Sequence, residues 1–221
     1  MTLRRRAVLV RRRTELEELL DRHSTRGQAE FFLRSRGRSL DEVQRAHDCA
    51  HEALAAVAAR LPEDWARTGV ERRDLAAFLF APEDVVIVVG PDGLVANVAK
   101  YLRGQVVIGI DPRPGAERGP LVPCDVRTGG ELIDRIADGE SPSVSRRTMV
   151  RARLDDGQEV TALNEVYLGH ASHQSARYRL DWRGRREFQS SSGVIVSTGT
   201  GATGWSASLA HDRGGRELPA P

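Results

Sequence analysis

The feature that most constrains the fold is the run DVVIVV at Asp84–Val89, which is β-branched and apolar after its first position. Such a strand is typical of a parallel sheet that is covered on both faces, because neither side of the strand then meets water. The turn GPDG follows at once, then LVANVAKYL with helical character, and then a second apolar strand over Val107–Ile110. This order predicts a βαβ unit within an α/β domain.

Further elements are predicted before this unit. A short strand is predicted over Ala7–Val10, and TELE at Thr14–Glu17 has the spacing of a helix-capping box, in which Thr and Glu side chains satisfy free backbone amides. SLDE at Ser39–Glu42 has the same spacing and opens a longer helix that ends before Pro62. The apolar stripe of that helix is predicted to comprise Val43, Ala46, Ala50, Leu54 and Val57.

The pattern changes after Gly139. TGGE at Thr128–Glu131 is predicted to cap a further helix, and beyond the SPSVS segment strands alternate with tight turns at Asp155–Gly157 and Arg183–Gly184. The fold class is therefore predicted as α/β plus β. A Rossmann-like nucleotide-binding domain is predicted over residues 1–140, and a β-rich, sandwich-like domain over residues 146–221.

Composition excludes several classes of protein. The chain has 221 residues, 40% of them hydrophobic, a formal net charge of +2 and a single lysine, Lys100. Nearly balanced charge does not predict a nucleic-acid partner, and no apolar run approaches the ~20 residues of a membrane helix. Cys49 and Cys124 are far apart without CxxC spacing, which argues against a disulfide framework and favours the reducing cytoplasm.

The turn at Gly90–Gly93 lies where α/β proteins hold phosphate, because a helix start presents free amides and a positive dipole end. Asp92 is unusual there, since a carboxylate repels phosphate unless a metal ion or a proton transfer requires it. The loop is neither a Walker motif nor GxGxxG. Pro-Asp-Gly is also ordinary turn chemistry, and both interpretations remain open on the residues alone.

A second polar feature is Asn164-Glu165, which interrupts an apolar strand between Leu163 and Val166. If one side chain points into a cleft, it needs polar partners, and the hydroxyl and amide groups of a ligand would serve. The alternative is an edge strand with both side chains in water.

The segment SSGVIVSTGTGATGWS places an apolar strand before residues with almost nothing to bury. Gly199, Gly201 and Gly204 allow the backbone to approach a ligand, and a helix beginning near Thr203 would aim its amides at phosphate. A flexible linker fits poorly, because Trp205 lies inside the segment. Small hydroxyl donors recur in it: Thr198, Thr200, Thr203, Ser206 and Ser208.

Taken in order, GPDG, VIGIDPRP, ALNEV and SSGVIVSTGTGATGWS resemble the NAD kinases, whose pattern runs GGDG, GIN, NEV, then DG followed by TPTGSTAYS. The pattern is most similar to the divergent branch that includes the animal mitochondrial NAD kinase, which shares the DP segment, the serine before glycine, TGTG and the tryptophan. The resemblance spans roughly Asp84 to Ser208.

The resemblance implies a phosphotransferase that converts NAD to NADP with ATP and a divalent cation, Mg²⁺, and that assembles as a homodimer or higher homo-oligomer. Asp92 matches the family's proposed base, which takes the proton of the adenosine 2′-hydroxyl. The β-rich half is then the NAD-binding domain, with its site facing Asp92 across a cleft. The implied binding residues are Gly90, Gly93, Asn164, Glu165, Thr198, Thr200, Gly201, Thr203, Gly204, Trp205 and Ser208.

The chain departs from the family pattern at several positions. Pro91 replaces a glycine and removes a backbone amide, and Leu94 replaces a threonine hydroxyl. Ser192 stands for the aspartate of DG, and Asp111 for the asparagine of GIN. The chain also ends soon after the small-residue segment, so the β-rich domain is predicted to be truncated. These departures favour an alternative, a catalytically impaired NAD(H)-binding regulatory module.

Other constellations give weaker predictions. His47 and His51 in HDCAH have i, i+4 spacing suited to zinc, but Asp48 matches the glutamate of HExxH badly and no third ligand is evident. His170 and His173 fit either a loop surface or the rim of a site. A serine nucleophile in GWSAS is excluded because the segment is not GxSxG. A related kinase with a lipid acceptor is disfavoured by NEV and TGTG.

Overall fold

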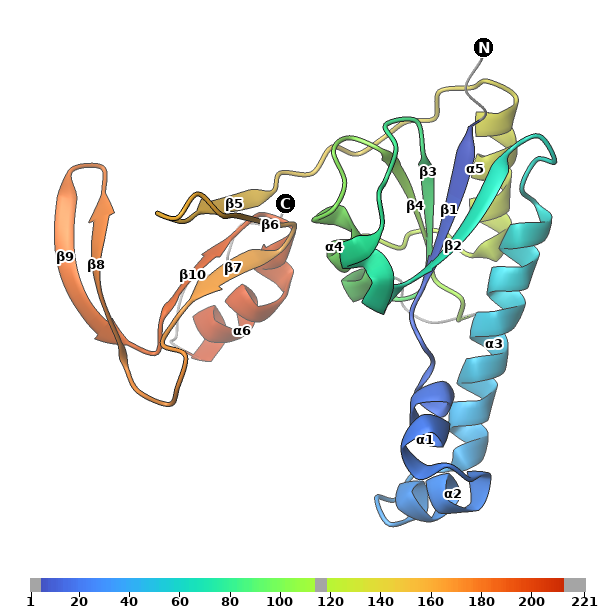
Figure 1. The fold of residues 1–221 in the computed structure, drawn as a ribbon, viewed down its shortest axis with the longest axis horizontal. Coiled ribbons are helices and arrows are strands. Elements are labelled where there is room, and N and C mark those ends of the chain that lie inside the picture. Colours follow the sequence, from blue (N-terminus) through green and yellow to red (C-terminus); the bar gives the residue numbers. More distant parts are fainter. Residues whose placement is uncertain (1–4, 114–118, 213–221) are drawn as a thin grey trace. The chain divides into compact units, whose positions relative to one another are not determined.

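The computed structural model describes residues 5–113 and 119–212. The chain divides into two units, Met1–Val144 and Ser145–Pro221, drawn from blue to yellow and from yellow to red in Figure 1. Each unit has its own sheets, and the residues from Glu140 to Met149 that join them form no regular helix or strand.

A four-stranded parallel sheet forms the centre of the first unit. Its order is β2–β1–β3–β4, made of Ala66–Glu71, Arg6–Arg11, Val85–Val89 and Val106–Ile110. All residues of β3 are buried, which confirms the prediction of a strand covered on both faces. The edge strand β2 has no counterpart in the sequence predictions, because its segment ARTGVE is mostly polar and half-exposed.

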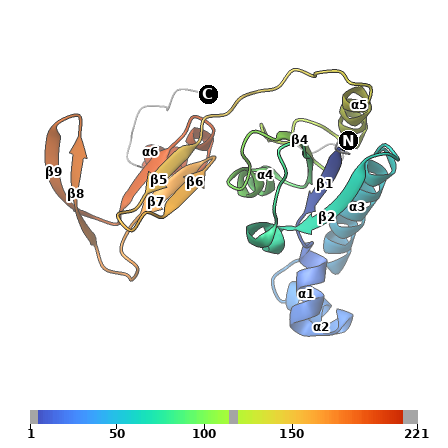
Figure 2. The same cartoon turned by 45° about the horizontal axis from the view of Figure 1, so that its top comes forward.

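Helices cover both faces of this sheet (Figure 2). α3 (Leu40–Ala59) and α5 (Val126–Ala137) pack against one face, while α4 (Asp92–Ala99) and the 3-10 turn η1 (Arg72–Ala77) pack against the other. The βαβ unit β3–α4–β4 is therefore as predicted. Side chains without solvent exposure meet in both layers: Ile87, Val57 and Ile133 in the first, and Val86, Val88 and Val98 in the second.

The N-terminal half of α3 extends beyond the sheet and packs with α1 (Glu15–His23) and α2 (Arg26–Arg34) around Leu33, which is 1% exposed (Figure 1). The predicted capping box at the start of α1 is confirmed. Thr14 Oγ1 accepts a hydrogen bond from Glu17 N, and Thr14 N donates to Glu17 Oε2.

Three helix predictions need correction. Ser39 caps α3 by accepting from Asp41 N rather than through a box with Glu42. Ala46 is exposed and Ala53 is buried in its place, because the second half of α3 turns its stripe toward the sheet. TGGE lies inside α5, whose cap is Asp125, the acceptor for Thr128 N at 2.7 Å. An aspartate carboxylate accepts from the free amides at a helix start as well as a serine or threonine hydroxyl does.

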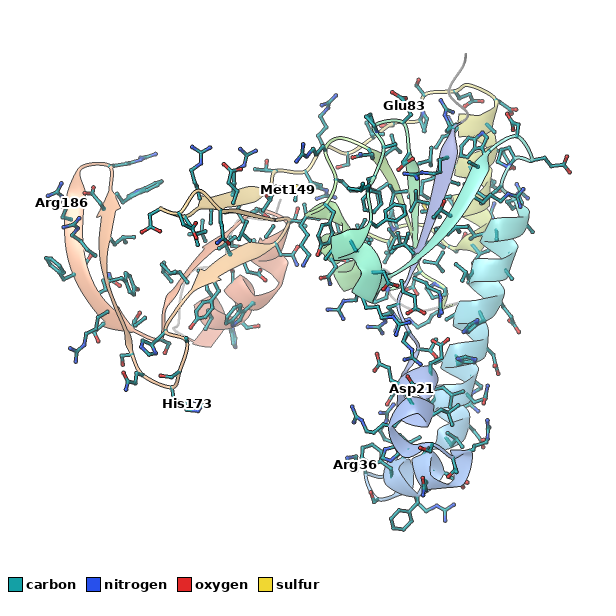
Figure 3. All side chains as sticks on the ribbon, viewed as in Figure 1. Asp21, Arg36, Glu83, Met149, His173 and Arg186 are labelled. Atoms are coloured by element: carbon teal, nitrogen blue, oxygen red, sulfur yellow. The ribbon has the colours of Figure 1, made fainter. Side chains whose placement is uncertain are left out.

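The second unit consists of short antiparallel pairs. β5 (Val150–Arg153) pairs with β6 (Glu159–Ala162), and β8 (Ala176–Trp182) pairs with β9 (Arg185–Ser191), so both predicted hairpins are confirmed. The β8–β9 hairpin carries Arg186, and the loop before it carries His173 (Figure 3). The remaining elements are β7 (Glu165–Leu168), β10 (Val194–Ser197), η2 (Gly201–Thr203) and α6 (Trp205–Asp212).

β7 pairs with β10 rather than with a hairpin neighbour, although the two are far apart in sequence. Among the described residues the second unit thus has three two-stranded sheets, and the sandwich form of this half remains a prediction. No helix within residues 5–113 and 119–212 is both long and apolar enough to cross a membrane.

Candidate functional site

The strand order of the first unit places one candidate site. β1 leads by way of α1–α3 to β2 on one side, whereas β3 leads through α4 to β4 on the other. The connections therefore diverge between β1 and β3, and α/β proteins bind ligands outside the carboxyl ends of the strands at such a point. Arg11 ends β1 there, and the GPDG turn follows β3.

Asp92 is the first residue of α4, with Pro91 as its cap. Its Oδ1 accepts a hydrogen bond from Leu121 N at 3.1 Å. A Cβ on Gly119 would lie 2.2 Å from the Asp92 carboxylate, so only glycine allows this approach of loop to acid. The helix dipole also favours a carboxylate at this end. No local sequence pattern predicts the contacts of Asp92 with Gly119 and Leu121, since these residues lie almost thirty positions away.

Gly90 and Gly93, on either side of Asp92, have different structural roles. Gly90 has φ +154°, donates to Ile110 O at 2.9 Å, and leaves no room for a Cβ beside Leu94 Cδ2 at 3.0 Å. It therefore shapes the turn. A Cβ on Gly93 would meet no described atom within 4 Å, so the packing of residues 5–113 and 119–212 does not demand glycine there.

Asp111 follows β4 at the same edge of the sheet and is 3% exposed. Its Oδ1 accepts from Arg113 N at 3.0 Å, and the Arg113 guanidinium pairs with it at 3.3 Å. Buried carboxylates need this kind of compensation. Asp92 and Asp111 therefore follow the carboxyl ends of the adjacent strands β3 and β4. Leu121 contacts both sides, because its N–H donates to Asp92 and its carbonyl oxygen lies against Gly109 of β4.

The second unit brings Asn164 and Glu165 together with the small-residue segment. Asn164 O accepts from Thr198 N at 2.9 Å, and Thr198 Oγ1 donates to Leu163 O at 2.5 Å and accepts from Gly201 N at 3.2 Å. A Cβ on Gly201 would lie 2.3 Å from Asn164 O. The TGTG turn is therefore closely packed against the NEV segment, and the flexible-linker interpretation does not hold for it.

Two polar atoms in this cluster are buried without a partner. Asn164 Oδ1 and Glu165 Oε2 have no hydrogen-bond partner anywhere in residues 5–113 and 119–212. An unpaired buried acceptor costs roughly 1–3 kcal/mol, so such atoms are commonly completed by a ligand or water. A sugar hydroxyl or an amide N–H would satisfy both.

The remaining predicted residues follow the same segment. Trp205 starts α6 and its ring lies 5.3 Å from the ring of Tyr167 on β7, a neighbour that sequence reasoning missed. Tyr167 donates to Ser192 O at 2.5 Å. The helix predicted near Thr203 begins two residues later, because the 3-10 turn comes first. Thr200 and Gly204 flank the 3-10 turn, Ser208 lies in α6, and the side chain of Thr203 is outside the described residues.

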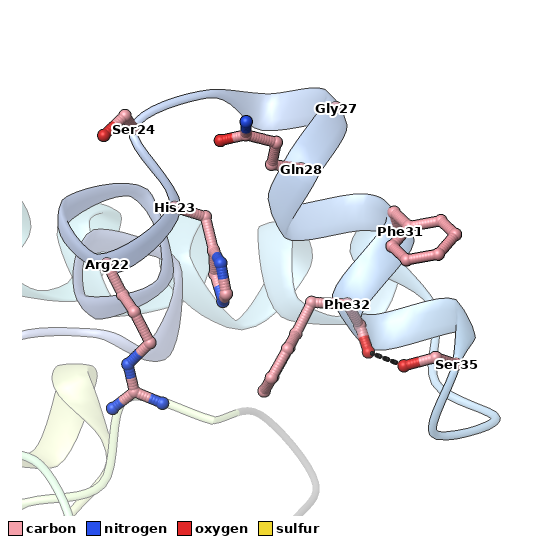
Figure 4. Close-up of a pocket in the computed structure, with 8 residues that line it drawn as sticks. All are labelled: Arg22, His23, Ser24, Gly27, Gln28, Phe31, Phe32 and Ser35. Atoms are coloured by element: carbon pink, nitrogen blue, oxygen red, sulfur yellow. Dashed lines mark hydrogen bonds between the residues drawn. The ribbon is translucent and has the colours of Figure 1, made fainter.

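The other sequence candidates lie elsewhere. His170 and His173 are exposed in a loop, and Asp48 accepts from Gln44 on the surface of α3. A hollow of about 540 Å³ opens between α1 and α2, beside Phe31 and Arg22 (Figure 4). None of the residues that line it is predicted to bind a nucleotide.

Comparison with known proteins supports the fold. No protein-family model matches the sequence, and no curated protein matches it either. Among solved structures, the chain is similar to yeast NADH kinase complexed with NADH, with a TM-score of 0.52 and 13% sequence identity. The match covers 99% of this chain and 63% of that chain.

The chain has the fold of that NADH kinase. This agrees with a parallel α/β sheet followed by antiparallel strands. The chain spans less than two thirds of the length of that enzyme, and at this identity the likeness establishes the fold alone. Activity has to be argued from the residues of the site.

Proposed function

We propose that the protein phosphorylates the adenosine 2′-hydroxyl of NAD(H) with ATP, giving NADP(H). Two independent supports point the same way. Ordered motifs between Asp84 and Ser208 resemble the NAD kinases, most closely the branch with the animal mitochondrial enzyme, and the fold is that of a kinase solved with NADH. The cytoplasm and a homo-oligomer belong to the same proposal.

The observation that carries the proposal is the pair of unsatisfied buried acceptors, Asn164 Oδ1 and Glu165 Oε2. They lie on the NEV segment, where the resemblance places the dinucleotide, and they are held there by the backbone bond from Thr198 to Asn164. Ribose hydroxyls of NAD(H) are donors of the right kind. The neighbouring Trp205 ring is 46% exposed and offers a face for the adenine base.

In the proposed phosphoryl transfer, Asp92 acts as the general base. A bond forms between the 2′-oxygen and the γ-phosphorus, and the bond from that phosphorus to the β,γ-bridging oxygen breaks, so ADP leaves. The hydroxyl proton passes to the Asp92 carboxylate. The bond from Leu121 N holds that carboxylate at the start of α4, where helix amides also face the ligand side.

A divalent cation is part of the proposal. Mg²⁺ usually binds through one or two carboxylates and the phosphates of its substrate, and Asp92 and Asp111 supply carboxylate oxygens at adjacent strand ends. Bound with ATP, it would neutralise charge on the transferred group. Asp111 is buried and paired with Arg113, whereas Asp92 is only partly buried, so Asp92 is the more accessible of the two.

A second candidate is an NAD(H)-binding module without efficient transfer. Pro91 favours it, because proline at the cap of α4 removes an amide that could otherwise face a phosphate. The two candidates share the dinucleotide site and differ only in turnover.

A coupled assay for NADP(H) formation separates the candidates. Purified protein is supplied with NAD or NADH, ATP and Mg²⁺, beside Asp92→Asn and the exposed control Asp64→Asn. A general base contributes about 10²- to 10⁴-fold, so Asp92→Asn should lose that factor while Asp64→Asn keeps the wild-type rate. NADH binding without turnover above the Asp92→Asn background would leave the binding module and refute the kinase.

A further inference from the structure

A cluster of possible metal ligands lies apart from the nucleotide motifs, between α1 and α3. His47 and His51 stand one helical turn apart on α3, with ring centroids 4.3 Å apart. Glu17 comes from α1 and supplies the third ligand that the sequence left missing. One ligand atom from each residue lies within 4.8 Å of the other two.

The spacing suits a small divalent cation. Zinc bonds to nitrogen and oxygen ligands of about 2.0–2.2 Å make the edge of a tetrahedron about 3.3–3.6 Å long. His51 Nε2 and Glu17 Oε1 are 3.4 Å apart, which is already such an edge. The remaining ligand has to move by about 1 Å or a little more, which a histidine side chain achieves by small χ rotations.

Neighbouring groups orient these ligands. The Thr14 hydroxyl is 2.7 Å from His47 Nδ1, and Thr14 N donates to Glu17 Oε2 at 2.7 Å. Ligating imidazoles and carboxylates are commonly fixed by outer hydrogen bonds of this kind. Burial raises the pKa of Glu17, but the bond from Thr14 and the Arg11 guanidinium outweigh burial and hold that pKa below its ordinary value.

The Arg11 guanidinium is the main opposing charge. It donates to Glu17 Oε1 at 3.1 Å, and it is partly neutralised by Glu71, with which it pairs at 2.5 Å. Access is from the side of His51, whose side chain is 44% exposed. His51 also borders a cavity of about 20 Å³, which Arg11, Arg12 and Thr14 line as well.

We propose that Glu17, His47 and His51 bind one divalent transition metal ion of the zinc class, with water in the remaining position. Two histidines and a carboxylate are a donor set that zinc, cobalt and nickel accept. Asp48 is no part of it, because its carboxylate is paired with Gln44. The ion cross-links α1 to α3 and so fixes the Thr14 loop that follows β1.

The test uses the full chain after chelator treatment, titrated with ZnCl₂ by calorimetry and with CoCl₂ by visible absorption. One ion should bind per chain, and the visible spectrum of the bound Co²⁺ should be that of a four-coordinate site. His51→Gln should weaken binding about tenfold or more, since one of three protein ligands is lost. His173→Gln, an exposed histidine of the second unit, should bind as the wild type does.

A rescue variant separates ligation from folding. His51→Cys keeps a zinc ligand and should restore tight binding, with a new thiolate-to-cobalt absorption. At the same zinc concentration, the unfolding midpoint should rise more for the wild type and His51→Cys than for His51→Gln. Absence of stoichiometric binding, or equal affinity in His51→Gln, would overturn the proposal; circular dichroism of each variant establishes that its helices are intact.

Discussion

Replacing Gly201 with alanine is expected to open the turn that holds the NEV segment. The added Cβ would lie 2.3 Å from Asn164 O, 2.6 Å from Asn164 C and 2.6 Å from Ser197 Oγ. Carbon and oxygen in contact normally stay about 3.3 Å or more apart. The turn therefore has to move by about 1 Å, and because the obstacle is backbone it cannot simply rotate away.

The cost follows from that displacement. Overpacking of this kind costs about 1–3 kcal/mol, and the bond from Gly201 N to Thr198 Oγ1 is the first to lengthen. If NADH contacts Asn164 Oδ1, a loss of this size weakens NADH binding about 5- to 150-fold. Fluorescence titration of NADH measures the affinity, and chemical denaturation measures the stability.

Gly69→Ala, on the edge strand β2 of the first unit, is the matched control. A Cβ there would meet no described atom within 4 Å. Its NADH affinity should stay close to that of the wild type. If Gly201→Ala binds NADH and unfolds like the wild type, the close packing of the TGTG turn on Asn164 has no bearing on the site.

Three further outcomes are expected. Gly93→Ala meets no described atom and should stabilise α4 by up to about 1 kcal/mol in denaturation, yet slow phosphoryl transfer if ATP approaches that backbone; equal rates would remove Gly93 from the site. Thr198→Val loses two hydrogen bonds and should cost about 1–3 kcal/mol, whereas Thr198→Ser should retain stability. The hydrogen bond from Arg38 lowers the pKa of Glu15, so this ion pair stabilises the fold above the ordinary Glu pKa of about 4.3, and the stabilisation is lost as pH falls through the lowered pKa. Arg38→Gln should therefore be less stable than the wild type at neutral pH and equally stable in acid. A difference in unfolding free energy that stays constant at all pH values would contradict this.

The elements predicted correctly from sequence are those whose signal is local. The β-branched run of β3 and the box at Thr14 depend on neighbours within a few residues, so the pattern contains all the information needed. The sequence pattern does not predict β2, because its mostly polar residues tolerate an edge position. The pattern also places the start of α5 too late, because the cap is Asp125 rather than Thr128. Ala46 and Ala53 exchange roles because packing on the sheet, rather than helix periodicity, decides which face is buried.

Contacts across the chain are the part that sequence could not supply. Gly119 meets Asp92, and Glu17 meets His51, only because the strands and helices bring distant segments together. The pairing of β7 with β10 is of the same kind, and it is what brings Asn164 to the TGTG turn. Local motifs therefore predict the candidate residues, whereas only the fold shows which residues they contact.

The most direct test of the central claim is an experimental structure of the protein with NADH bound. We expect the adenosine ribose to contact Asn164 and Glu165, and its 2′-oxygen to lie within hydrogen-bond reach of the Asp92 carboxylate, about 2.6–3.2 Å, or one water away. A ribose bound at Asn164 and Glu165 whose 2′-oxygen faces solvent, with Asp92 still turned to Leu121, would contradict it.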